Sequence, residues 1–586
     1  NILNHFNCTL PIQRLWLADG LNRSAIGKAM EHLLPPHKTK SLYRASQARS
    51  LSDWYFIFPS MAYTRLNSHQ EGITSVGRVQ TPTLNLAVER DREVRKHCPA
   101  THYQIELTFS AGEERFICHY PSDGENILSD PIQLNLILSG LKQQREASVV
   151  EQMITTTDET ETPQPHSLSS LQKALSGDEL TISQSQKGAE QLYRKGLVSY
   201  PRTSTQTDSL SPPKPHSLLS LQGALQQQFS HTANHSSQLI QRLYDLGFIS
   251  YPRTASQELP PNHINSPEQV VILKNLSQLP ELTIQAKSCK GFIQKQQTPF
   301  SHTNDQTTSH AAHWAIIPTD RTPQLQQLTH KERAAYLEIS RRYLQTLYPP
   351  AQLNQQRLLI TITLPTGKKL KITHQTTQIK EPGWTAAFGH SIDEQPPIKL
   401  NGSQLQITQY RLITKQTVPP THYNDYTLLL AMEHAGNHTT GIGTPATRAD
   451  TIELLIDRGY LRRSGSTLRT TKRGASLIQQ VPAWLRSART TSKWEKELKQ
   501  IASTEDDHSA ITIRDQFTSQ QRENITELME QLLLLLPDRK INQITTPPSE
   551  KMIHYAETLS RKKCVQLPKH YQTDWRVCHD FINKHQ

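Results

Sequence analysis

The chain carries the same segment twice, about fifty residues apart. The run "PHSLSSLQKAL" begins at Pro165 and returns as "PHSLLSLQGAL" at Pro215, and "LYRKGLVSYPRT" returns as "LYDLGFISYPRT", which places matching tyrosines at Tyr200 and Tyr251. The periodicity of the copied unit indicates two helices followed by a short strand. A solenoid needs about three or more stacked units. Two copies therefore predict a local duplication of one module within a larger protein.

Each copy ends in Ser-Tyr-Pro-Arg-Thr, and this pentapeptide is open to two interpretations. A phenol with a pKa of about 10 is a weak nucleophile at neutral pH, but an Arg two positions later favours the phenolate and can hold a phosphate oxygen. Proline fixes the backbone and keeps the preceding Tyr extended. The segment is either a nucleophilic site for a phosphodiester, or a strand that ends in a proline turn with a packed Tyr and a solvated Arg.

The charge balance indicates a polyanionic partner. The 586 residues include 64 Lys and Arg against 52 Asp and Glu, a formal net charge of +12, and basic side chains bind nucleic acids by displacing counterions from phosphates. The length predicts several domains. None of the six cysteines forms a C-x-x-C pair, which argues against a zinc ribbon or a disulfide framework and favours reduced thiols in the cytoplasm. The sequence has no run of about 18 apolar residues, so no membrane span is expected.

Hydrophobic periodicity divides the chain into helical and strand-forming parts. Apolar positions at three- and four-residue spacing predict helices between Arg14 and His97. Alternating segments predict strands at "HYQIELTFSAGEERFICHY", "ASVVEQMITTT" and "LNQQRLLITITLPTGKKLKITHQTT". A helix is expected at "YNDYTLLLAMEHAG", and "GTPATRADTIELLIDRGYL" resembles a winged-helix-like turn and helix. The polar run "TTTDETETPQPHS" predicts a linker, and the residues from Thr545 onward predict a small helical unit.

Several longer motifs follow one another in a fixed order: "RLWLADGL", "ARSLSDW", "SVGRVQTPTLNLAVERDRE", the two Tyr-Pro-Arg modules, "AHWAIIPT" and "GIGTPATRADTIELLIDRGYL". In these blocks the chain resembles the type IA DNA topoisomerases, most closely the topoisomerase III branch of bacterial chromosomes and mobile elements. The resemblance covers nearly the whole chain. It implies a multidomain α/β fold, in which mainly helical lobes and a β-rich arch form the toroid of that family.

The resemblance also implies an order of domains. The expected parts are residues 1–100 for the segment next to a Toprim domain and the DNA-groove helices, 101–160 for the first part of the arch, 161–212 for the first active-site module, 213–330 for the second module with a His-bearing loop, 331–420 for the second part of the arch, 421–540 for a helical, winged-helix-like DNA-binding region, and 541–586 for a small C-terminal helical domain.

Residue roles follow from the same resemblance. The expected catalytic residues are the two tyrosines, the arginines two positions later and the histidine of "AHWAIIPT", namely Tyr251, Tyr200, Arg253, Arg202 and His313. The expected contacts with single-stranded DNA are Arg49, Arg78, Gln80, Thr444, Thr447 and Arg448. Taken alone, such residues are equally well explained as helix caps and solvated charges. Trp54 and Trp314 could stack on bases, but core packing is the preferred interpretation of both.

Only one tyrosine can occupy the site of a single closed ring, and we favour Tyr251. The first copy has the better match upstream of its Tyr-Pro-Arg. The second copy is followed by "QELPP", as the resemblance leads us to expect, and it keeps about the usual spacing to His313.

The chain departs from the family where a metal site is expected. The family holds Mg²⁺ near the scissile phosphate on a Glu and an Asp-x-Asp-x-Glu cluster, and no D-x-D-x-E occurs here, so no metal ligand is assigned. We expect Mg²⁺ as the family's cofactor, with its ligands upstream of Asn1, on a separate Toprim-bearing chain, or lost. A first residue other than Met predicts a fragment. Met61 also stands where the resemblance predicts Arg.

Two functions remain open from the sequence. One is a type IA topoisomerase that, without ATP, cuts one DNA strand through a 5′-phosphotyrosine, passes a strand and religates the cut. The other is an inactive or truncated relative that only binds single-stranded DNA. A tyrosine recombinase would need a different arrangement of Arg and His around its Tyr. We expect a cytoplasmic, nucleoid-associated monomer that acts on single-stranded or negatively supercoiled DNA, with a helicase as a candidate partner.

Overall fold

The computed structural model describes residues 13–15, 23–68, 72–122, 127–156, 209–210, 212–260, 263–294, 314–390, 392, 394–400, 404–435, 441–535, 548–563, 565–572 and 575–585. The chain forms two compact units, residues 1–53 with 77–519 and residues 54–76 with 520–586. No helix in the described ranges has both the length and the apolar character that crossing a membrane requires.

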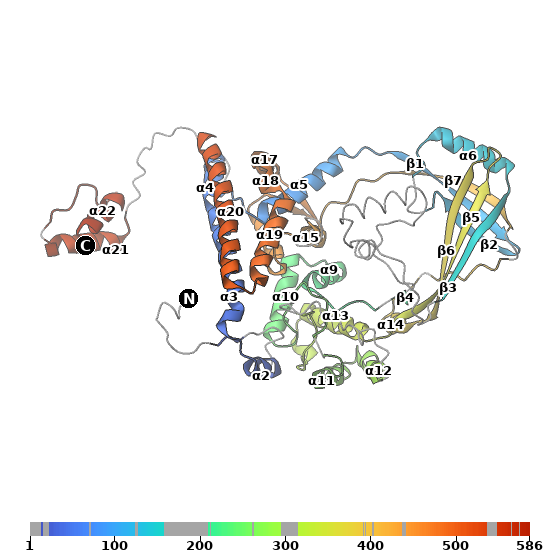
Figure 1. Cartoon of the computed structure of the whole chain (residues 1–586), viewed down its shortest axis with the longest axis horizontal. Coiled ribbons are helices and arrows are strands. Elements are labelled where there is room, and N and C mark those ends of the chain that lie inside the picture. Colours follow the sequence, from blue (N-terminus) through green and yellow to red (C-terminus); the bar gives the residue numbers. More distant parts are fainter. Residues whose placement is uncertain are drawn as a thin grey trace. The chain divides into compact units, whose positions relative to one another are not determined.

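The first unit contains an antiparallel sheet built from distant parts of the chain (Figure 1). Its order is β2-β1-β7-β3-β5-β4, and β6 pairs with β5, so a late strand, β7, inserts between the early strands β1 and β3. The strands are Thr101–Ala111 (β1), Glu114–Tyr120 (β2), Glu146–Thr156 (β3), Ser209–Leu210 (β4), Ala351–Thr363 (β5), Lys369–Glu381 (β6) and Gln404–Gln416 (β7).

One face of this sheet is covered by helix α6 (Pro131–Gln143). Alternate residues of β1, including Ile105, Leu107 and Phe109, are fully buried, as the period of two in a strand requires. Leu134, Ile137 and Leu141 of α6 join the same apolar core. The helix begins after Asp130, whose carboxylate accepts the Ile132 N–H at 2.9 Å, and Pro131 occupies the first helical position.

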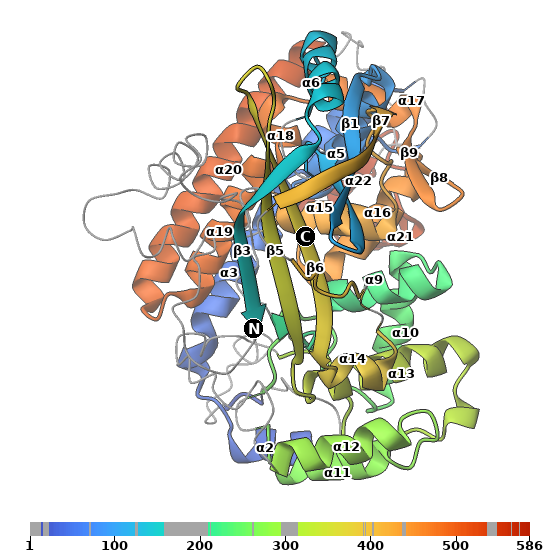
Figure 2. The ribbon, with the colours of Figure 1, turned by 90° about the vertical axis from the view of Figure 1, so that its right-hand side faces the viewer.

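A helical lobe follows β4 and carries the second copy of the repeat (Figure 2). Its core is one apolar cluster that includes Leu221, Ile240, Ile316, Tyr336 and Tyr343. Side-chain oxygens of Ser217, Thr232, Ser266 and Thr329 cap four of its helices, which satisfies amide groups at the helix starts. The elements are Leu218–Phe229 (α9), Ala233–Asp245 (α10), Pro267–Leu276 (α11), Thr283–Gln294 (α12), Leu325–Gln327 (η4), His330–Thr346 (α13) and Gly383–Phe388 (α14).

A second group of helices in this unit packs around α5 (Gln80–Lys96). Helix α16 (Pro445–Asp457) leads into the small β8–β9 hairpin and then into α17, which is the order of a winged helix. The remaining elements of the first unit are Arg23–Glu31 (α2), Pro36–Thr39 (η1), Lys40–Tyr55 (α3), Asp425–His434 (α15), Leu461–Ser464 (β8), Thr467–Thr470 (β9), Lys472–Gln480 (α17), Ala483–Arg486 (α18), Ala488–Ser503 (α19) and Asp507–Leu535 (α20). The end of α3 and the part of α20 from Gln520 onward belong to the second unit.

The second unit includes a helical hairpin near the end of the chain. Its helices, Glu550–Lys563 (α21) and Trp575–His585 (α22), share a small core of Ala556, Leu559, Cys578, Phe581 and Ile582. The early helix of this unit is Ile57–Leu66 (α4).

The prediction that Trp54 packs in the core is wrong. Its side chain is 51% exposed, and its ring lies edge-on to that of Phe58, with 5.1 Å between the ring centroids. Trp54, Ile57, Phe58 and Met61 follow the spacing of one helical face, and all four are exposed. Trp314 is half-buried.

The predicted fold class is confirmed in its elements. Helices account for most of the described residues between Arg23 and Lys96, and strands occupy all three alternating segments. The predicted helix near Tyr423 is α15, the predicted turn and helix after Gly443 is α16, and the tail is helical. The predicted linker lies outside the described residues except for Thr155 and Thr156, which end β3. The first module, 161–212, lies outside them except for Ser209, Leu210 and Pro212.

The contact between α9 and α15 leads to the first testable prediction. A methyl group added at Gly223 would lie 2.5 Å from Cε2 of Tyr426, whose backbone N–H donates to Oε1 of Gln226 at 2.7 Å. We expect Gly223→Ala to destabilise the fold by about 1–3 kcal/mol, because the Tyr426 ring must move. The midpoint of urea unfolding measures this loss.

Gly291 is the matched control for this substitution. It lies within α12 and has no atom within 4 Å of an added methyl group. Gly291→Ala should leave the urea midpoint unchanged or raise it slightly, since alanine favours helix more than glycine does. Equal effects of the two substitutions would show that the α9–α15 contact is not tightly packed.

Candidate active site

Three segments that the sequence marked as motifs meet beside the second copy of the repeat. The backbone N–H of Ile316 donates to the carbonyl of His216 at 2.7 Å, and the N–H of Ser250 donates to the carbonyl of Ile317 at 2.9 Å. Residues 315–319 therefore lie between the start of the copied module and its Ser-Tyr-Pro-Arg-Thr end. The N–H of Leu218 closes the arrangement by donating to the carbonyl of Thr254 at 3.0 Å.

Ser250 holds the tyrosine-bearing segment with its side chain as well as its backbone. Its hydroxyl donates to the carbonyl of Ala315 at 2.9 Å and accepts the N–H of Ile317 at 2.9 Å. On the other side of the turn, the Thr254 hydroxyl accepts the N–H of Ser256 at 2.9 Å. The residues between these two anchors, Tyr251 to Arg253, are thus fixed at both ends.

Tyr251 is half-buried against the apolar core of the lobe. Its ring meets that of Tyr244 nearly at a right angle, 84°, with 5.6 Å between the centroids, a favourable edge-to-face geometry. Tyr244 comes from the end of α10, so the same helix that supports the turn also orients the tyrosine ring. Burial raises the pKa of Tyr244, and the neighbouring Tyr251 adds to this shift.

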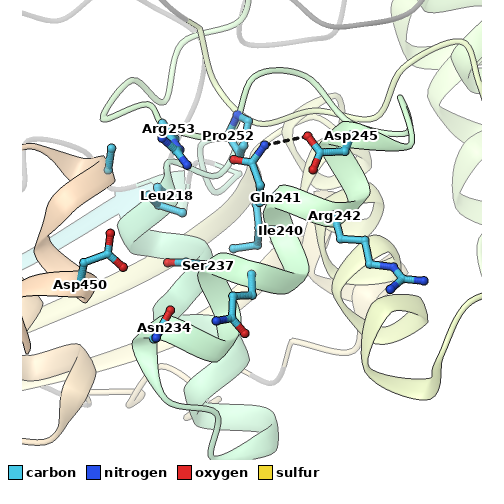
Figure 3. A pocket seen from close by; sticks show the side chains of 12 residues that line it. Leu218, Asn234, Ser237, Ile240, Gln241, Arg242, Asp245, Pro252, Arg253 and Asp450 are labelled. Carbon is cyan, nitrogen blue, oxygen red and sulfur yellow. Dashed lines mark hydrogen bonds between the residues drawn. The ribbon is translucent and has the colours of Figure 1, made fainter. Parts of the chain in front are cut away.

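Arg253 lies at a pocket of about 360 Å³ (Figure 3). Its side chain is exposed, and among the described residues it forms no ion pair with a carboxylate. The guanidinium is therefore available to an anion from solution, which suits a residue expected to hold a phosphate.

A buried polar pair braces the start of this module. His216 is fully buried, and its Nε2 lies 3.3 Å from Oε1 of Glu338 on α13, while its Nδ1 lies 3.0 Å from the Ser220 hydroxyl. Burial lowers the pKa of His216. Burial raises the pKa of Glu338, but hydrogen bonds from His216 and Gln228 outweigh it and lower that pKa to about 2. A neutral His216 that donates to a charged Glu338 accounts for both directions.

Because of this pair, we expect the stability of the fold to decrease as the pH is lowered. His216 takes up a proton near pH 6.5 when unfolded but only at lower pH in the fold, and Glu338 does so near pH 4.5 when unfolded but near 2 in the fold. In both cases the unfolded chain binds more protons as the pH falls, so acid favours unfolding. We expect the urea midpoint to decrease below about pH 6.5 and again below about pH 4.5. Glu338→Gln should reduce the lower step, to which Glu281 and Glu332 also contribute because the fold lowers their pKa values too. A midpoint that rises on acidification would contradict the assignment.

Two of the arginines expected at a DNA groove are engaged with carboxylates. Arg78 is 4% exposed and contacts both Asp53, at 3.0 Å from Nε, and Glu495. Arg49 binds the other oxygen of Glu495 at 2.8 Å. Burial lowers the pKa of Arg78, but the charges of Asp53 and Glu495 outweigh it and raise that pKa. Both arginines thus hold α3, α5 and α19 together in this structure, and their contact with DNA stays a prediction.

The remaining expected DNA contacts lie at helix starts. Thr444 and Thr447 form the capping box of α16, with 3.0 Å between their hydroxyls. Arg448 is buried rather than solvated, because its Nη1 lies 2.5 Å from Oε2 of Glu433 and its Nε donates to the Ile442 carbonyl at 3.2 Å. Gln80 is the half-buried first residue of α5 and lies against Gly77.

Comparison with known proteins decides which family this arrangement belongs to. The sequence profile of the DNA topoisomerase family matches residues 37–209 and 204–512. The first match contains the first copy of the repeat, and the second contains the other copy together with residues 315–319. The chain belongs to the type IA DNA topoisomerase family.

Relatives of this topoisomerase chain include several proteins named DNA topoisomerase 3. That of Vibrio cholerae is 26% identical over 530 residues, which cover 84% of this chain and 71% of the relative. That of Haemophilus influenzae is 28% identical over 559 residues, covering 89% and 73%. That of Bacillus subtilis is 26% identical over 545 residues, covering 88% and 64%. This topoisomerase chain thus spans 64% to 73% of the length of these three relatives.

A solved structure supports the fold of this topoisomerase chain. Full-length topoisomerase I from Thermotoga maritima superimposes with a TM-score of 0.58 and 17% sequence identity, over 94% of this chain and 77% of that one. The mixed α/β fold expected of the family is therefore confirmed, including its helical lobes and its strand-rich part.

Some residues expected at the site of this topoisomerase lie outside the described residues. These are Tyr200, Arg202 and His313. Within the described part of the chain, no three His, Cys, Asp or Glu side chains come together in a way that could hold a metal ion. The described residues therefore do not fit the family's Mg²⁺, and no chemical step is derived through it.

Sequence reasoning missed three features of this candidate site. Glu338 lies on a helix that matched no motif, although a glutamate on the apolar face of "HKERAAYLEISRRYL" could have signalled a buried polar pair. Ser250 gave no separate signal in the sequence, because it adjoins Tyr251 within the same motif. The role of the α10 residues that line the pocket could not be predicted from the sequence, because a polar helix face is usually just exposed to solvent.

Proposed function

We propose that this chain is a DNA topoisomerase that cuts one DNA strand with Tyr251 as the nucleophile. The observation that carries the proposal is the meeting of two motifs: residues 216–218 and 249–254, the two ends of the second copy of the repeat, bond to each other and to residues 315–319. Tyr251 is half-buried there against Tyr244, and Arg253 follows it with an exposed guanidinium that pairs with no carboxylate of the described residues.

The proposed step exchanges one ester for another. The phenolic oxygen of Tyr251 loses its proton and attacks the phosphorus of a phosphodiester. The new O–P bond forms as the bond from phosphorus to the 3′ oxygen breaks, and that oxygen leaves as a 3′ hydroxyl after taking up a proton. The 5′ phosphate stays on the tyrosine, so the bond energy is conserved and the reverse attack by the 3′ hydroxyl religates the strand. No nucleotide triphosphate is needed.

Arg253 is proposed to bind the phosphate oxygens on which charge increases during the attack. A guanidinium can hold two oxygens at once, and such contacts gain most where charge develops. Pro252 limits the backbone between the two residues, while Ser250 and Thr254 fix the segment on either side. The positions of nucleophile and cation are therefore set before DNA binds, which lowers the entropic cost of the reaction.

Single-stranded and negatively supercoiled DNA are the proposed substrates. The net charge of +12 supports a polyanionic partner, and the family match supports DNA as that partner. A helicase and a second, Toprim-bearing chain are retained as proposed partners from the sequence.

Relaxation of a negatively supercoiled plasmid in the presence of Mg²⁺ tests the proposal. We expect a ladder of topoisomers without ATP. Binding of single-stranded DNA without relaxation, and without any covalent product, would favour the second function, a protein that only binds DNA. Absence of both would overturn the proposal.

A further inference from the structure

The pocket beside Arg253 has a chemistry that the proposed cleavage step does not use. It holds about 360 Å³, within the usual range for pockets that bind small molecules. One wall is the face of α10 that carries Asn234 and Ser237, and the opposite wall is α16 with Asp450 (Figure 3). Pro252 and Arg253, which directly follow Tyr251, line it as well. Whatever enters this pocket lies next to the proposed nucleophile.

Several polar groups of the pocket have hydrogen-bonding capacity left. Among the described residues, Asp450 and Arg253 form no ion pair, although both line the pocket, and the Asn234 amide forms no hydrogen bond. Ser237 accepts from Nε2 of Gln222 at 2.8 Å, so its own hydroxyl proton remains free to donate.

Three other polar residues of the lining, Gln241, Arg242 and Asp245, are already engaged. The Gln241 amide donates to Asp245 at 2.8 Å. Arg242 pairs with Glu332 at 2.5 Å, and Figure 3 shows its guanidinium directed away from Asp450. With the exposed amide of Gln238, the groups that have capacity left among the described residues are one acceptor-only carboxylate, two amides, one hydroxyl and one guanidinium, with Leu218 and Ile240 as apolar lining.

We propose that this pocket takes an unpaired nucleobase whose exocyclic amino group lies beside an acceptor ring nitrogen, adenine or cytosine, while Arg253 holds a phosphate of the same strand. Asp450 accepts from the amino group, and Asn234 and Ser237 donate to the neighbouring ring nitrogen or carbonyl. Carboxylates and amides recognise these bases in the same way in nucleic-acid complexes, and apolar side chains cover the faces of the ring. Thymine has no amino group, so it leaves the Asp450 carboxylate without that partner.

The pocket would thus give the cleavage site a preference for certain bases. The biological role of this preference rests on the proposed function. Its test is binding rather than cleavage, so that the two can fail separately. Single-stranded oligomers of dA, dC and dT are titrated into the full chain at fixed salt, and the free nucleotides dAMP, dCMP and dTMP are titrated in parallel. We expect dA and dC oligomers to bind about tenfold more tightly than dT.

Asp450→Asn should abolish most of that preference while it leaves binding of the dT oligomer unchanged. The matched control is Asp457→Asn, an exposed carboxylate at the end of the same helix that does not line the pocket. Asn234→Ala provides a second variant on the opposite wall and should weaken the same preference.

Each outcome of this experiment decides something. Equal binding of all three oligomers by the unaltered chain, or the same preference in Asp450→Asn and Asp457→Asn, overturns the inference. Preferential binding of free dAMP or dCMP, lost in Asp450→Asn, supports the base pocket and identifies a free nucleotide as a possible occupant besides the strand. Base preference without any covalent product supports the pocket and removes only the proposed cleavage. If no oligomer and no nucleotide binds, both the base pocket and the proposed DNA cleavage are overturned.

Discussion

Tyr251→Phe removes the covalent product between this chain and a 3′-labelled single-stranded oligonucleotide. The substitution deletes the one oxygen that can form the ester to phosphorus, and loss of a nucleophile typically costs at least about 1,000-fold in rate. Phenylalanine keeps the ring that packs against Tyr244 at 5.6 Å, so the lobe should fold as before. The label on the 3′ side follows the protein because the proposed bond is to the 5′ phosphate. Denaturing gel electrophoresis after rapid quenching with detergent measures the product.

Tyr200→Phe is the matched control, since it makes the same change in the first copy of the repeat. We expect it to leave the covalent product intact. Loss of the product in Tyr200→Phe but not in Tyr251→Phe would transfer the chemistry to the first copy. A product that survives in both single variants and disappears only in the double variant would mean that the two copies can substitute for each other.

Glu495→Ala is expected to be among the most destabilising single substitutions in the first unit. Glu495 is 6% exposed and receives both Arg78 and Arg49. Its removal leaves the buried guanidinium of Arg78 with only Asp53, a carboxylate that is itself 54% exposed. Breaking a buried ion pair in this way costs about 3–5 kcal/mol, because one charge stays buried without its partner. The urea midpoint, followed by circular dichroism, measures the loss.

Glu497→Ala separates this effect from the loss of a charge on α19. Glu497 lies two residues further along the same helix, 3.8 Å from Lys493, whose side chain is 76% exposed. Burial raises the pKa of Glu497, so its charged form is not strongly stabilised by the fold. We expect a change within about 0.5 kcal/mol for this control. If the urea midpoint of Glu495→Ala were as close to that of the unaltered chain as the midpoint of Glu497→Ala, water or a rearranged Asp53 would be compensating the buried charge of Arg78.

Local patterns were enough to predict most elements of the fold. Strands β1 and β5 follow from the alternation in "HYQIELTFSA" and "LNQQRLLITIT", and α16 follows from its Thr-Pro start, because side-chain period and capping are properties of neighbouring residues. The insertion of β7 between β1 and β3 could not be predicted in this way. Strand order depends on contacts between residues about 300 positions apart, which periodicity does not encode.

The site was predicted where it coincides with motifs and missed where it depends on distant partners. The meeting of Ser250 with Ala315 and Ile317 joins two motifs, and their joint presence already indicated a shared site. The partners of Arg78 and Arg448 were not foreseen. Glu495 lies more than 400 residues from Arg78, and nothing in the sequence around either residue marks the pairing. An arginine in a motif therefore gave no sign of whether it is exposed or buried.

The pairing of β4 with β5 has a mechanical consequence for the lobe that carries Tyr251. The chain runs into the lobe after Leu210, which pairs with Ala351, and returns to the sheet at Ala351 itself. These two covalent connections of the lobe thus emerge at the same end of two adjacent strands. Tension applied to the lobe pulls these strands in the same direction. The load is therefore shared between two connections and is not concentrated on peeling one strand from its neighbour.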